Sequence, residues 1–104
     1  MFLNHEDDSI GAASDAHKVV FENELVRVLD VVVPVGYKSA SHWHPKNMGF
    51  VLTGGKLRFI LPDGIVKDVE LSKDQVTQGA GSHIVENIGD SEVRVLQVEF
   101  KLVQ

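Results

Sequence analysis

The sequence predicts an all-β domain, built as a sandwich or a barrel, and two observations lead to this prediction. Short segments rich in β-branched and aromatic residues recur along the chain, separated about every eight to twelve residues by Gly, Pro, Asn, Asp or Ser turns. No segment has the apolar period that would bury one stripe of a helix. The chain of 104 residues has the length of one domain.

Taken in order, the chain begins with a polar, small-residue segment from residue 1 to about residue 17, which we expect to be a tail or a peripheral segment. His5 and His17 fall in this segment, and we expect both to be solvent-exposed, because chain termini are usually poorly ordered. The expected strands then lie at residues 19–21, 25–33, 41–44, 47–52, 56–61, 65–71, 75–78, 83–87 and about 92–103.

Proline and glycine residues mark the breaks between these strands. Pro34 ends the long strand at 25–33, and Pro45 interrupts the strand that begins at residue 41. Residues 62–64, Pro-Asp-Gly, predict a tight hairpin, because Asp-Gly tolerates the positive φ that such turns need. Residues 79–81, Gly-Ala-Gly, are expected to bend the chain sharply.

The last strand alternates over its whole length, so it presents two different rows of side chains. One row contains Val93, Val95, Gln97 and Glu99, and the other contains Leu96, Val98, Phe100 and Leu102. If the first row faces a barrel interior, Gln97 is a polar group in an apolar cavity and a candidate ligand contact. If that row faces solvent, which Glu99 and Lys101 favour, Gln97 has no such role. The sequence leaves both interpretations open.

Composition and charge exclude several classes of function. The formal net charge is −5 with scattered Lys and Arg, which argues against a nucleic-acid partner. The absence of cysteine excludes disulfides, thiolate metal sites and a cysteine nucleophile. The acidic first residues do not form a signal peptide, and no apolar run is long enough to span a membrane. We therefore expect a soluble, cytoplasmic, acidic domain without a membrane partner.

The residues most suited to chemistry are two histidines in a predicted strand. His42 and His44 are two positions apart, so a β-strand places both imidazoles on one face. Neutral imidazole is a common ligand of Zn, Fe, Cu and Ni. His83 lies far along the chain in a similar strand-like context. The sequence contains no visible Ser–His–Asp or paired-carboxylate arrangement. Acidic residues fall mostly in turns or at strand positions expected to face outward, so general acid–base catalysis by carboxylates is unsupported.

At these residues the sequence resembles the cupin superfamily. Its first motif is Gly, five residues, His-x-His, three or four residues, Glu, six residues and Gly, and Gly36, His42, His44 and Gly55 fall at those spacings. In the second motif His83 and Asn87 match in separation. The stretch before His83 is a shortened form, with Gly79 where proline is usual and one residue fewer. The resemblance extends from about Leu25 to the end of the chain.

This resemblance implies the jelly-roll β-barrel of a small single-domain cupin, with a metal site inside one mouth of the barrel. We expect residues 25–104 to form the barrel, and residues 1–24 to be a tail or a β-arm exchanged between the subunits of a homodimer. The implied ligands are His42, His44 and His83. The ion would be a divalent transition metal, Fe, Mn, Ni or Zn, which the sequence does not distinguish.

Met48 stands where the cupin motif has its glutamate ligand. If the strand from His44 is regular, Met48 faces the pocket as an apolar wall and Asn47 faces away, although Pro45 could disturb this register. A thioether is a poor ligand for Fe(II), Mn(II) or Zn(II). The metal would then keep its full charge and attract anions, because no protein group neutralises it. Whether Asn47 or water replaces the missing glutamate stays open.

The expected substrate pocket is lined by Met48, Phe50, Phe59 and Gln97, although residues such as Phe50 and Phe59 more often belong to the core than to a substrate platform. Two functions fit these features. The first is a metal-dependent enzyme, dioxygenase-like or isomerase-like, acting on a small oxygen-rich or anionic metabolite. The second is a cupin that binds a small ligand without catalysis, as a sensor or a sugar-binding module. A purely structural role does not explain the three histidines.

Overall fold

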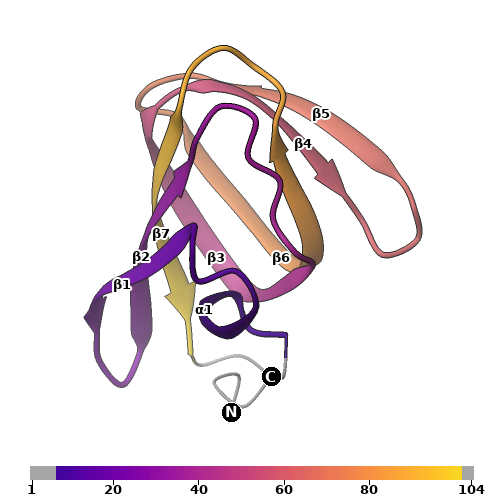
Figure 1. Cartoon of the computed structure of the whole chain (residues 1–104). Coiled ribbons are helices and arrows are strands. Elements are labelled where there is room, and N and C mark those ends of the chain that lie inside the picture. The colour runs from indigo at the N-terminus through magenta and orange to yellow at the C-terminus, as the bar shows by residue number, and fades with distance from the viewer. Residues whose placement is uncertain (1–6, 102–104) are drawn as a thin grey trace.

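The computed structural model describes residues 7–101 as one curved, antiparallel sheet of seven strands with a short helix at its N-terminal end (Figure 1). The strands are in the order β1-β2-β7-β3-β6-β4-β5, so neighbours in space are mostly distant in sequence. The elements are α1 (Ser9–Ala12), β1 (His17–Glu22), β2 (Val26–Val33), β3 (His42–Thr53), β4 (Gly55–Ile60), β5 (Val66–Leu71), β6 (Val76–Asn87) and β7 (Val93–Phe100). The all-β jelly-roll prediction is thereby confirmed.

The interior of the sheet is filled by alternate residues of several strands. In β2 the even spacing of the buried side chains follows the two-residue period of a strand, with Leu29, Val31 and Val33 inward. Residues from four other strands complete this core: Val51, Leu57, Val85, Val93 and Val95. Burial of each such side chain contributes about 1.5–3 kcal/mol, so this cluster is the main source of stability.

Strand β7 has one face toward the interior of the sheet and one face toward the outside. Val93 and Glu99 have no exposed surface and Val95 is buried, so the row that also contains Gln97 faces the interior. Leu96 and Phe100 lie on the outer face of the sheet. The interpretation of Glu99 as a sign of solvent on this row is therefore wrong, because Glu99 is buried and pairs with Arg27 inside the protein.

The central strands β3 and β6 are both continuous over 12 residues, where the sequence predicted breaks. Their pairing contains a β-bulge: His44 lies opposite Gly81 and Asn47 opposite Gly79, so three steps along β3 match two along β6. Pro45 occupies this bulge rather than ending the strand. Gly81 has a φ of +98°, a conformation that glycine adopts without strain. The extra residue reverses the parity of the β3 side chains from Asn47 to Val51, where a second register shift follows.

The N-terminal segment, as far as it is described, packs against the barrel of its own chain. Strand β1 pairs with β2, and the Val32 amide donates to the Ala16 carbonyl at 2.9 Å. Asp8 caps α1 by accepting from the Ile10 amide. The exchange of residues 1–24 between subunits stays a prediction, and His5 lies outside the described residues. No described helix has the length and apolarity to cross a membrane.

Candidate metal centre

Four histidines meet at one end of the interior, three from the central strands and one from the N-terminal strand. His42 and His44 project from the same face of β3, and His42 lies opposite His83 of β6 in the ladder. The His42 ring is at the centre of the cluster, with ring centroids at 4.7 Å from His17, 4.9 Å from His44 and 4.8 Å from His83. The structure therefore brings together all three histidines of the sequence motif and adds His17.

The expectation that His17 is a solvent-exposed tail residue is wrong. Its side chain is buried, and its ring centroid lies 5.0 Å from that of His44. One ring nitrogen from each of His17, His42 and His44 lies within 4.8 Å of the other two. The local sequence carried no signal of this role, because His17 is the one buried residue of β1 and the apolar residues that follow it, such as Val19, are exposed.

The hydrogen bonds of these three histidines fix which nitrogen is available to a metal. The Nδ1–H groups of His17 and His42 donate to the carbonyls of Ala13 at 2.9 Å and Ala40 at 2.8 Å. The Nδ1–H of His44 donates to Glu99 Oε2 at 2.6 Å. A carbonyl or carboxylate only accepts, so each Nδ1 carries the proton and each Nε2 keeps its lone pair. Metal-bound histidines are held in this way.

His42 Nε2 supplies an independent sign of a missing ligand. It is buried and has no hydrogen-bond partner among the described residues. An unsatisfied buried polar atom is costly, typically about 1–3 kcal/mol, and calls for an unseen partner. The cupin fold and this histidine cluster fit metal binding, and the donor set of neutral imidazoles suits Fe, Mn, Ni or Zn without selecting among them.

Burial keeps these imidazoles neutral. Removal from water lowers the pKa of His17 to about 4 and the pKa of His44 to about 3. The same cause lowers the pKa of His83 to about 3, with the neighbouring His44 and His42 adding to the effect. The pKa of His42 is lowered as well, again mainly by burial. Neutral rings are the form that binds metal.

A buried ion-pair network lies directly behind His44. Glu99, which has no exposed surface, accepts from Arg27 Nε at 2.9 Å through its other carboxylate oxygen. Arg27 also donates two bonds to Asp8, at 2.8 and 2.9 Å. Burial raises the pKa of Glu99, and the Arg27 guanidinium opposes that shift. Two carboxylates thus share one guanidinium.

This network corrects two expectations drawn from the sequence. Acidic residues are not confined to turns and outer faces, since Asp8 and Glu99 are both buried. Nor would a metal here lack compensating charge on the protein, because the two carboxylates and Arg27 together carry a net charge of −1 beside His44 when both carboxylates are ionised.

The predicted places of Met48 and Asn47 are exchanged. Asn47 lines the interior cavity, whereas Met48 is 44% exposed and borders a depression on the outer face of the sheet. The β-bulge after His44 is the cause, because one added residue moves the following side chains to the other face. The prediction that Met48 is an apolar wall of the pocket is therefore wrong.

Phe50 follows Met48 to the outer face, so its assignment to the pocket is wrong for the same reason. Phe59 and Gln97 do line the interior cavity. The Phe59 ring contacts His83, with centroids at 4.9 Å. The Gln97 amide donates to Glu99 Oε2 at 3.3 Å and lies 3.0 Å from His44 Nδ1, at the edge of the histidine cluster.

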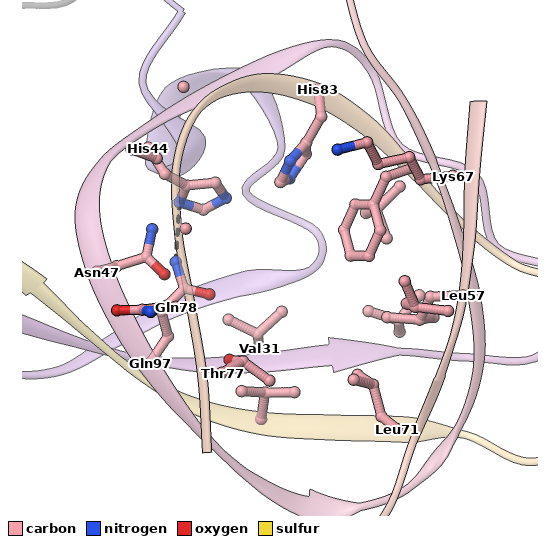
Figure 2. A pocket seen from close by; sticks show the side chains of 18 of the residues that line it. Val31, His44, Asn47, Leu57, Lys67, Leu71, Thr77, Gln78, His83 and Gln97 are labelled. Carbon is pink, nitrogen blue, oxygen red and sulfur yellow. Dashed lines mark hydrogen bonds between the residues drawn. The ribbon is translucent and has the colours of Figure 1, made fainter. Parts of the chain in front are cut away.

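The interior cavity has a volume of about 730 Å³ and opens directly beside the histidines His17, His44 and His83. Figure 2 shows the amide side chains of Asn47, Gln78 and Gln97 on the His44 side of the cavity, while Leu57 and Leu71 lie further from His44 and His83. A cavity of this size accommodates a small metabolite together with water.

Comparison with known proteins confirms the cupin resemblance through the fold. A cupin domain from Bordetella pertussis is 25% identical, with a TM-score of 0.74 over 82% of this chain and 91% of the other. A Klebsiella pneumoniae protein with a double-stranded β-helix domain is 22% identical, with a TM-score of 0.64 over 79% and 72% of the two chains. An RmlC-like cupin family protein from Methanocaldococcus jannaschii is 14% identical, with a TM-score of 0.64 over 81% and 77%.

No protein-family model matches this sequence, and no curated protein matches it. The protein thus has the fold of a small single-domain cupin, and its activity has to be argued from its own site.

Proposed function

We propose that the protein is a metal-dependent enzyme of the cupin fold that acts on a small oxygen-rich or anionic metabolite. His17, His42 and His44 would hold one divalent ion, Fe, Mn, Ni or Zn, and His83 would stand at the edge of the same site. When bound, the ion would polarise an oxygen of the substrate, which is the chemistry that dioxygenase-like and isomerase-like reactions share.

One observation carries this proposal. Each of the three imidazoles donates its Nδ1–H to a fixed acceptor, and one ring nitrogen of each lies within 4.8 Å of the others. Histidines that only fill a core do not need all three Nδ1–H groups bound to fixed acceptors with the three Nε2 lone pairs left available. The substrate would enter the adjoining cavity, where Asn47 and Gln97 supply amide groups beside the histidines.

The direct test is elemental analysis of the purified protein without a histidine tag, followed by titration with Fe(II), Mn(II), Ni(II) and Zn(II). We expect about one ion per chain, and a loss of affinity of at least tenfold in His17→Ala and His42→Ala. The matched control is Lys18→Ala, the exposed neighbour of His17 on β1. A protein that comes out free of metal and takes up none of the four ions contradicts the proposal.

A second candidate is a binding cupin without turnover, and one observation favours it. The two buried carboxylates beside the histidines, Asp8 and Glu99, are both tied to Arg27, so neither is free to act as a general base. Stabilisation by a small ligand in the presence of EDTA, unchanged in His83→Ala, would favour this function. Stabilisation that needs the metal, and turnover that His42→Ala abolishes, would favour the enzyme.

A further inference from the structure

The cavity beside the histidines has a distinct polarity along its length. Amide side chains of Asn47, Gln78 and Gln97 lie on the His44 side, and Lys67 extends toward His83 (Figure 2). The aliphatic side chains of Leu57 and Leu71 line a part of the cavity away from His44 and His83 (Figure 2). A molecule with polar atoms at one end and hydrocarbon at the other is therefore matched to these two parts of the cavity.

Lys67 reaches the interior through the alternation of β5. Val69 and Leu71 pack against the core cluster, and Lys67 has the same parity, so its side chain leaves the strand on the inner face. In the ladder with β4 it lies opposite Phe59, whose ring contacts His83. Lys67 is itself exposed, and its side chain extends along the cavity toward His83 (Figure 2).

The charge around this position is not balanced by the protein. Among the described residues that line the cavity, Lys67 is the one Lys or Arg, and none of the ion pairs between described residues involves it. Glu70 also borders the cavity, but it has the opposite parity on β5 and lies across from Lys56. Nearby Arg58 and Asp68 pair with each other on the outer face at 2.7 Å.

We propose that the cavity is specific for a small carboxylate with a short apolar body. The carboxylate lies between Lys67 and the histidine cluster, and the apolar body lies against Leu57 and Leu71. This inference rests on the proposed function, because it assigns the substrate class of the same site, but it draws on Lys67 and the aliphatic wall rather than on the metal ligands.

The test uses three probes: 4-methylpentanoate, its neutral amide 4-methylpentanamide, and acetate, which has the charge without the apolar body. Binding is measured by calorimetry to the Zn-loaded and to the metal-free protein. We expect 4-methylpentanoate to bind about tenfold more tightly than the amide and than acetate, since a charge-assisted contact and hydrocarbon burial each contribute that much or more. In Lys67→Gln the preference for carboxylate over amide should fall about tenfold.

Two controls separate this inference from the proposed function. Lys73→Gln, an exposed lysine between β5 and β6, should bind all three probes as the unmodified protein does. The Zn affinity of Lys67→Gln should equal that of the unmodified protein, because Lys67 is not a ligand. If no metal binds but the metal-free protein prefers carboxylate in a Lys67-dependent way, the proposed function fails and this inference stands.

Three results would overturn the inference. One is equal binding of 4-methylpentanoate and its amide to the Zn-loaded protein. Another is an unchanged carboxylate preference in Lys67→Gln. The third is absence of binding by every probe, to the loaded and the metal-free protein alike. The metal proposal survives each of these results, because the Zn titration is measured separately.

Discussion

Glu99 of β7 accepts the Nδ1–H of His44 of β3 at 2.6 Å while its second oxygen accepts from Arg27. The Glu99 carboxylate therefore fixes the orientation and the tautomer of the His44 ring. It also places a negative charge directly behind this proposed ligand. Such partners of ligand histidines typically change metal affinity by about 10–100-fold when they are replaced.

The first prediction concerns this carboxylate. Glu99→Gln removes the charge and nearly preserves the shape, so we expect Zn affinity to fall by about 10–100-fold in a competition assay with a chelator. Glu99→Asp should recover part of the loss. The control is Glu92→Gln, which lies exposed just before β7 and should bind Zn normally. Unchanged affinity in a folded Glu99→Gln protein would contradict a role through His44.

The second prediction tests the register of β3. Because Asn47 lines the cavity and Met48 lies outside, a carboxylate introduced at position 47 lies beside the histidines and one at position 48 does not. We expect Asn47→Glu to increase Zn affinity by about tenfold or more, since an anionic oxygen ligand is added. Met48→Glu, which restores the residue type of the cupin motif, should leave it within about twofold. A higher Zn affinity in Met48→Glu and an unchanged affinity in Asn47→Glu would contradict the β-bulge after His44.

The third prediction concerns acid stability of the metal-free protein. His17, His44 and His83 have folded pKa values of about 4, 3 and 3, below the usual value of 6.5. Between the folded pKa values and 6.5, the unfolded chain binds more protons than the folded protein does. The contribution of these neutral histidines to the free energy of unfolding is therefore fully present above about pH 6.5 and is lost as the pH falls toward 4. Each such histidine removes about 1.4 kcal/mol per pH unit in that range.

Urea denaturation at pH 7.5, 6.0 and 5.0 measures this loss. The variant His83→Leu should show a weaker dependence on pH, because one buried imidazole no longer has to stay neutral. A denaturation midpoint that stays constant from pH 7.5 to 5.0 would contradict the burial of neutral histidines.

The fourth prediction separates backbone conformation from space at the bulge. A Cβ at Gly79 or Gly81 would meet no atom within 4 Å, but only Gly81 of the two has a positive φ. Gly81→Ala should therefore lower the free energy of unfolding by about 1 kcal/mol or more, whereas Gly79→Ala should be neutral or mildly stabilising. Equal effects of the two substitutions in urea denaturation would argue against the bulge geometry.

The fold was predictable because it depends on a repeated local signal. Alternation in segments such as 25–33 and 92–103 reports burial at each position, and glycine and proline mark the turns. The histidine pair on β3 was visible for the same reason, since residues two apart share one face of a strand. His83 was found by its resemblance to a motif and not by its local pattern.

The wrong predictions have two physical causes. One is a single inserted residue that changes the alternation of side chains along a strand, and the other is burial caused by residues distant in sequence. The bulge after His44 adds one residue, and Pro45 and the nearby glycines only hint at it, so Met48, Phe50 and Asn47 were assigned to the wrong faces. His17 and Glu99 are buried because of partners 4 to 72 positions away, Ala13, His44 and Arg27, which a local pattern does not report.

The short N-terminal segment bears on how this protein should be handled at the bench. Residues 8 and 17 supply a partner of Arg27 and a proposed ligand, although they precede the part of the sequence that resembles a cupin. A shortened protein that begins at Leu25 would contain His42 and His44 of β3, but it would lack His17, the third histidine of the proposed metal site. Metal measurements on such a truncated form would report on a different site from that of the intact chain.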